Sequence, residues 1–106
     1  MPPRRTRPRD LGSDWPDRVV DDPAGEVARR IAVALRTATA GLSLRQVAEA
    51  TGVNYTTVRD VLLGNTFGDS ITISRLEIGL GVALWPADFT AAAARRRGVA
   101  DDAEAP

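Results

Sequence analysis

Two short helical patterns separated by a tight turn fill residues 43–64, and no other segment constrains the fold of this chain as strongly. Ser43 is a good N-cap for the first pattern, because its hydroxyl can accept a hydrogen bond from a free backbone N–H one turn further on. Gly52 stands where a left-handed backbone commonly ends a helix. Asn54 can cap the second pattern, and Gly64 can end it. The segment therefore predicts two short helices joined by a tight turn.

The second of these patterns separates an apolar face from a polar one. At roughly 100° per residue, three apolar side chains fall on one side, namely Val58, Val61 and Leu62. The outward positions are Thr56, Arg59, Asp60 and Leu63, flanked by Tyr55 and Thr57. A short helix with an outward polar face, placed directly after a tight turn, is typical of units that insert a helix into the major groove of DNA.

Helical patterns continue on both sides of this segment. An apolar stripe over residues 24–39 predicts a helix before it. A second apolar pattern predicts a helix after it, which Asp69 or Ser70 can cap and Gly81 can end. Gly79 lies inside the later pattern, where glycine costs about 1 kcal/mol relative to alanine, so we expect close packing there. Alanines followed by arginines predict a fifth helix near residues 87–97. The expected fold is all-α, a compact domain of four core helices plus a fifth over residues 24–97.

The same periodicity predicts which side chains are buried. The later helix is expected to turn four apolar residues toward the core, namely Ile73, Leu76, Ile78 and Leu80. The residues expected to cover the base of the core are Val82, Leu84 and Trp85. Three arginines of the first helix are expected to face solvent, namely Arg29, Arg30 and Arg36.

The two ends of the chain differ from this central part. Residues 1–23 are rich in Pro, Arg and Asp, which predicts a flexible arm. Trp15, Val19 and Val20 are the places where this arm could anchor on the core. Residues 98–106 are acidic and short, which predicts a disordered tail.

Composition limits the classes of function. The 106 residues include no cysteine and no histidine, so the commonest zinc ligands and the commonest general base are missing. We therefore expect no metal, no cofactor and no enzymatic activity. No apolar run approaches the roughly 20 residues needed to span a bilayer, and the N-terminus lacks the apolar stretch of a signal peptide. These features predict a soluble cytoplasmic protein without a membrane partner.

The charge distribution says more than the net charge, which is zero. Arginines gather in an N-terminal arm and in a C-terminal run, comprising Arg4, Arg5, Arg7 and Arg9, then Arg95, Arg96 and Arg97. The arm could enter a minor groove or serve only to keep the chain soluble, and the run could simply end a helix. Residues 24–86 are close to neutral, so phosphate contacts would give modest affinity unless the arms help or the protein is a dimer.

The central block resembles the helix-turn-helix of the lambda-repressor-like, or Xre-type, DNA-binding family. The positions that carry the resemblance are Ala48, Gly52, Val53, Val58, Val61 and Gly64, and the likeness extends over roughly residues 24–86. One departure is Leu44, since the family often has glutamine there. The resemblance implies a sequence-specific transcriptional regulator, in the first instance a repressor. It would bind double-stranded DNA as a homodimer, with the helix over residues 54–63 in the major groove.

Residues on and around that helix would contact the DNA. Tyr55 would contact a thymine methyl group or a phosphate, or else pack on the surface of the domain. Thr56 would point at the bases or be a neutral exposed residue. Arg59 would donate two hydrogen bonds to guanine, or remain solvated or pair with Asp60. Asp60 could accept a hydrogen bond from cytosine, orient Arg59 or face away. The other candidate DNA-binding residues are Ser43, Arg45, Asn54, Thr57, Asn65 and Thr66. Apart from the cap Asn54 these are candidate phosphate ligands, and a plain capping or loop role is the alternative for each.

The main rival hypothesis is a protein-interaction role. The same fold could serve as an antitoxin or an adaptor that binds another protein, with DNA contact secondary or lost. The near-neutral core and Asp60 favour this alternative.

Overall fold

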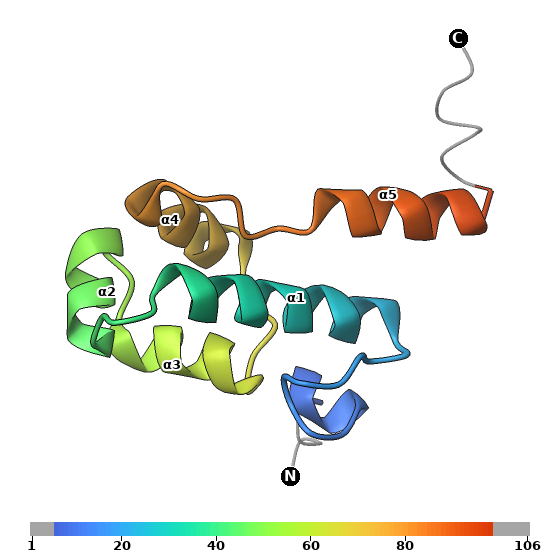
Figure 1. The fold of residues 1–106 in the computed structure, drawn as a ribbon, viewed down its shortest axis with the longest axis horizontal. Helices are drawn as coiled ribbons and strands as arrows, with labels where there is room; N and C mark the ends of the chain where they lie inside the picture. Colours follow the sequence, from blue (N-terminus) through green and yellow to red (C-terminus); the bar gives the residue numbers. More distant parts are fainter. Residues whose placement is uncertain (1–5, 99–106) are drawn as a thin grey trace, which may run out of the picture.

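The computed structural model describes residues 6–98, and within them every regular element is a helix (Figure 1). In chain order these are a 3₁₀ helix, η1 (Pro8–Leu11), and five α-helices: α1 (Pro23–Ala38), α2 (Leu44–Thr51), α3 (Tyr55–Leu63), α4 (Ser70–Leu80) and α5 (Ala87–Arg96). The predicted all-α class is confirmed, and each predicted helix is present. Predictions for the N-terminal Arg4 and Arg5 and for residues 99–106 of the acidic tail lie outside the described residues.

Local caps explain where the helices begin and end. Asp22 starts α1 by accepting hydrogen bonds from the N–H groups of Ala24 and Gly25, with Pro23 at the first helical position. Asp69, one of two residues expected to cap the later helix, accepts from Thr72 N at 2.7 Å and starts α4. These caps are short-range interactions, so the sequence predicts the helix ends well.

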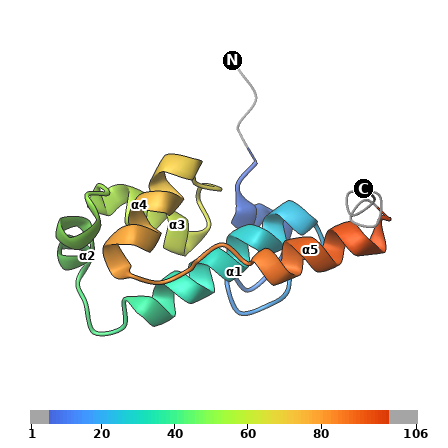
Figure 2. The ribbon, with the colours of Figure 1, turned by 90° about the horizontal axis from the view of Figure 1, so that it is seen from above.

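Helices α1 to α4 enclose one core, with α1 running through the middle of the molecule (Figures 1 and 2). Helix α3 packs on one side of α1, while α2 contacts both α3 and α4. The core cluster of buried apolar side chains comes from these four helices, from the α2–α3 turn and from the segment after α4: Ile31, Leu35, Val47, Val53, Val58, Val61, Ile73, Leu76 and Leu84. The polar side of α3 therefore faces away from a continuous apolar core.

The predicted apolar face of α4 is wrong at one residue. Ile73 and Leu76 are buried and Leu80 packs against the core as expected, but Ile78 is 82% exposed. At roughly 100° per residue, Ile78 lies about 200° around the helix from Leu76, so the two side chains cannot share a buried face. The backbone of Gly79 lies against the end of α2, where a Cβ would come within 2.6 Å of Ala50 O and of Thr51 Cα, and this confirms the expected close packing. Of the residues expected over the base of the core, only Leu84 is buried; Val82 and Trp85 are exposed.

The described part of the N-terminal arm packs against the helices. Pro8 and Val20 are buried, and Trp15 is partly buried against the end of α3, whereas Val19 is exposed. Two of the three expected anchor points therefore contact the body of the protein. Residues 6–22 are not loosely draped, because apolar side chains and specific hydrogen bonds hold them.

Helix α5 extends beside the N-terminal half of α1 and away from the core (Figure 2). None of its residues is fully buried. It is held near α1 by Phe89, whose ring lies 4.4 Å from the guanidinium carbon of Arg30. Across residues 6–98, no helix is long and apolar enough to cross a membrane.

Candidate functional site

The turn between α2 and α3 is held by its own side chains. Ser43 and Gln46 form a reciprocal capping box at the start of α2, with N···O distances of 3.1 and 2.8 Å. At the other end, the buried Thr51 hydroxyl donates to Val47 O at 2.7 Å and accepts from Val53 N at 3.2 Å. Gly52 lies between them with φ of +73°, a conformation that favours glycine. Together these contacts set the direction in which the chain leaves α2.

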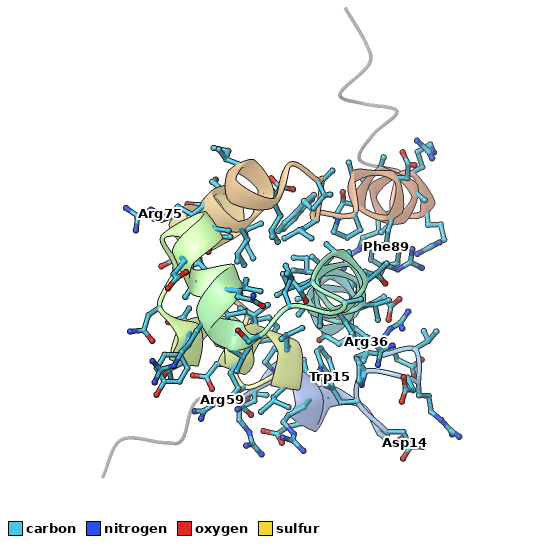
Figure 3. The ribbon with its side chains drawn as sticks, turned by 60° about the vertical axis from the view of Figure 1, so that its left-hand side comes forward. Asp14, Trp15, Arg36, Arg59, Arg75 and Phe89 are labelled. Carbon is cyan, nitrogen blue, oxygen red and sulfur yellow. The ribbon has the colours of Figure 1, made fainter. Side chains whose placement is uncertain are left out.

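Helix α3 presents the predicted polar face to solvent. Tyr55 is 47% exposed and the Arg59 side chain 49% exposed, while Val58 and Val61 are buried. Arg59 points away from the body of the protein (Figure 3). Tyr55, Arg59 and Leu63 are thus exposed as the periodicity predicts, whereas Thr56 and Asp60 are only partly exposed.

Five of the ten predicted site residues are already engaged in local hydrogen bonds. Their partners lie within five residues along the chain, and the five are Ser43, Asn54, Asp60, Asn65 and Thr66. Asn54 caps α3 through Thr56 N at 2.8 Å, and Thr66 accepts from Gly68 N at 3.2 Å. Asn65 donates its side-chain amide to Asp60 at 3.2 Å. For these residues the capping or loop role is the one the structure displays.

Asp60 lies between two of the other candidates. Its Oδ1 is 3.2 Å from Asn65 Nδ2 and 3.7 Å from Arg59 Nη2. The carboxylate is partly buried and lies toward the C-terminal end of α3, where it offsets part of the charge of Arg59. The carboxylate is therefore held by a hydrogen bond from Asn65, and its contact with Arg59 is a longer ion pair.

The other side chains of the predicted site are uncommitted. Within residues 6–98, no hydrogen bond or ion pair engages the side chains of Arg45, Tyr55, Thr56 or Thr57. Arg59 has only the long pair with Asp60. Exposed donors and an exposed aromatic ring without intramolecular partners can bind a ligand without first breaking protein contacts.

The sequence patterns missed a contact at the C-terminal end of α3. The indole Nε1–H of Trp15 donates to Leu62 O at 3.0 Å, and Arg9 N donates to Gly64 O at 3.0 Å. Trp15 was expected as a possible anchor on the core, but no local pattern indicated Leu62 O as its partner. The N-terminal segment is therefore part of the surroundings of the candidate site.

A buried carboxylate, also missed, holds this segment on α1. Glu26 is 2% exposed and accepts hydrogen bonds from Val20 N at 3.0 Å and from both Arg29 and Arg30 at 2.7 Å. Hydrogen bonds from Arg29, from Val20 N–H and from Arg30 lower the pKa of Glu26 from 4.5 to about 2, against the opposing effect of burial.

The Arg29 side chain is only 15% exposed and also donates to Pro16 O at 3.1 Å, so its predicted solvent position is wrong. Its charge is compensated by Glu26, which is why an arginine can lie there. Glu26 and Arg29 are three positions apart in a predicted helix, and this spacing of opposite charges could have indicated the ion pair.

Two further sources of information about the site, metal-binding groups within residues 6–98 and similar proteins, gave no match. The described residues bring together no group of three His, Cys, Asp or Glu side chains suited to a metal ion. No protein-family model, no curated protein and no solved structure matches the chain.

Proposed function

We propose that this protein is a sequence-specific double-stranded DNA-binding transcriptional regulator that reads the major groove with α3. The observation that carries the proposal is the outward face of α3, where Tyr55, Thr56 and Arg59 are accessible and have no strong intramolecular partner. The α2–turn–α3 unit, held on α1 and α4, has the layout of a helix-turn-helix. The resemblance of residues 24–86 to the lambda-repressor-like family supports the same conclusion.

Each accessible residue has a role that fits its chemistry. Arg59 donates two hydrogen bonds to guanine O6 and N7, with Asp60 orienting its guanidinium. Tyr55 contacts a thymine methyl group or a phosphate, and Thr56 contacts a base edge.

Phosphate contacts come from the start of α2 and from its neighbours. The capping box at Ser43 satisfies Gln46 N, and the first backbone N–H groups of a helix otherwise lack intrahelical acceptors. These groups, with Arg45 and Thr57, can hold the DNA backbone. The neutral balance of residues 24–86 limits this contribution, which is why we propose a homodimer on two half-sites.

Repression then follows from steric exclusion, because a dimer across two major grooves covers the DNA that polymerase or another regulator would need. We propose that the dimer interface forms around Phe89, Val82 and Trp85. Val82 and Trp85 are exposed, while the ring of Phe89 already lies against the Arg30 guanidinium. Sedimentation of the free protein and of its DNA complex tests this, and a monomer in both would exclude the dimer.

The function is tested by selecting bound sequences from a random DNA pool with the purified protein and with Arg59→Ala. Arg75→Ala is the matched control, because Arg75 is an exposed arginine on α4 rather than α3 (Figure 3). We expect an enriched motif that is relaxed by Arg59→Ala and retained by Arg75→Ala. A pool without enrichment at low salt would overturn the proposal.

A protein-interaction role is the second candidate, and Asp60 on α3 together with exposed Ile78 on α4 favours it. Salt separates the two functions. Binding through several phosphates weakens steeply as salt rises, whereas an interface of apolar side chains does not.

A further inference from the structure

The C-terminal end of α3 is capped by hydrogen bonds from the N-terminal segment of the chain. The last carbonyls of a helix have no intrahelical donor. Here Leu62 O accepts from Trp15 Nε1 and Gly64 O accepts from Arg9 N, both at 3.0 Å. We call residues 6–20 the N-terminal brace. The brace therefore supplies hydrogen-bond donors at the end of the helix that carries the candidate site.

The contact is also a close steric fit. A Cβ on Gly64 would lie 2.5 Å from Trp15 Cε2 and within 2.9 Å of two further indole atoms. The indole thus packs directly on the Gly64 backbone, as its position between η1 and α3 shows (Figure 3). A side chain at residue 64 and the docked indole cannot occupy the same space.

The other half of the brace is fixed to α1. Val20 N donates to the buried Glu26, and Pro16 O accepts from Arg29. A Cβ on Gly25 would lie 2.7 Å from Val20 Cγ1, so the brace lies close to the α1 backbone as well. The brace consequently connects the N-terminal half of α1 to the C-terminal end of α3.

The core fixes only one side of the last turn of α3. Val61 is buried there, but Leu62 is only half-buried and Leu63 is exposed. The brace adds two hydrogen bonds and the indole contact to this same turn and to the Gly64 that ends it. Functional sites depend on shifts of about 0.5 Å, so the tilt of a recognition helix has to be fixed at both ends.

We propose that the N-terminal brace positions α3 for DNA readout, with Trp15 as the positioning residue. This proposal rests on the proposed function, since it assigns the brace a part in the specificity of the same site. Trp15 itself contacts no base. It acts by holding the orientation of α3 and hence of Arg59.

The experiment uses Gly64→Ala to expel the indole, with Gly81→Ala as the matched control. Both glycines end a helix with nearly equal φ, +71° and +68°, but a Cβ on Gly81 would meet nothing within 4 Å. The two substitutions therefore impose a similar backbone strain, and only Gly64→Ala also disturbs the brace. Each variant is made in the natural chain and in a Trp15→Ala background. The affinities for selected and for unrelated duplexes are measured well below the melting temperature.

We expect Gly64→Ala to weaken binding of the selected duplex roughly tenfold more than Gly81→Ala, within the range for coupled neighbours. Binding to unrelated duplex should change little, because no phosphate ligand is removed. In the Trp15→Ala background the two glycine variants should become equivalent. Equal losses for both variants in the natural chain would overturn the positioning role.

A measurement without DNA keeps the proposal separate from the proposed function. In Trp15→Ala, amide hydrogen exchange should accelerate in residues 61–65 while the amides of α4 retain their protection. Uniform acceleration, or none, would overturn the brace as a positioning element. If the natural chain selects no DNA sequence but the local exchange effect is present, the regulator function fails and the tie between the brace and α3 stands.

Discussion

Gly79 and Thr51 approach so closely that a Cβ on Gly79 would lie 2.6 Å from Thr51 Cα. This contact lets α4 cross the end of α2, which in turn begins the turn that leads into α3. A glycine inside a helix normally weakens it, so its presence here reflects packing rather than helix propensity.

The first prediction concerns this crossing. Gly79→Ala should lower the free energy of unfolding by about 1–3 kcal/mol, because overpacking outweighs the gain in helix propensity of about 1 kcal/mol. Chemical denaturation measures the change. Ser74→Ala on the exposed side of α4 is the control and should shift stability by less than about 0.5 kcal/mol. An increase in stability for Gly79→Ala would contradict the close approach.

The second prediction concerns the α2–α3 turn. Thr51→Val keeps the shape of the side chain but leaves the buried N–H of Val53 without the hydroxyl acceptor seen at 3.2 Å. We expect a loss of about 1–3 kcal/mol in unfolding free energy. Thr51→Ser retains the hydroxyl and should lose less. If Thr51→Val proved as stable as Thr51→Ser, the hydroxyl would not support the turn.

The third prediction concerns pH. The pKa of Glu26 is lowered from 4.5 to about 2 in the folded protein, so the unfolded chain binds the proton more readily. The stabilisation by Glu26 is therefore complete above pH about 4.5 and is lost as the pH falls toward 2. Thermal melts between pH 6 and 2 should show this loss.

The variant Glu26→Gln tests whether this pH dependence of stability comes from Glu26. Glu26→Gln should destabilise the protein at neutral pH by a few kcal/mol and flatten its acid dependence, because Arg29 loses its charged partner. Asp17→Asn is the control, since the Asp17–Arg36 pair is exposed and should contribute little. An unchanged acid profile in Glu26→Gln would show that other carboxylates cause the loss.

The fourth prediction separates phosphate contacts from base contacts. Arg45→Ala should weaken binding to all duplexes alike and reduce the salt slope by about 1, as expected for one lost phosphate contact. Arg59→Ala should instead reduce the preference for the selected sequence, at about 1–3 kcal/mol for one bidentate contact. Titrations at several salt concentrations measure both quantities. The opposite pattern would exchange the roles proposed for the two arginines.

The helix boundaries could be predicted because their determinants are local. Ser43, Gly52 and Asn54 each act on backbone groups within four residues, and the structure shows each in the expected capping position. The outward face of α3 follows from periodicity for the same reason. The burial expected of Ile78 was wrong for a local reason, because at roughly 100° per residue it lies about 200° around the helix from Leu76. The end of α2 as the partner of Gly79 could not be predicted in this way, because the two elements meet only in the packed core.

The amino-acid sequence by itself determined the all-α class, the helix ends and the candidate face of α3, since these depend on caps and on the 3.6-residue repeat. Only the tertiary structure decided that Trp15 closes the end of α3 and that Glu26 is a buried ion-pair centre. Trp15 and Leu62 are 47 positions apart, and no local pattern encodes a contact of that range. Such a contact forms only once α1 and α3 pack together, because their packing brings the Trp15 indole within reach of Leu62 O.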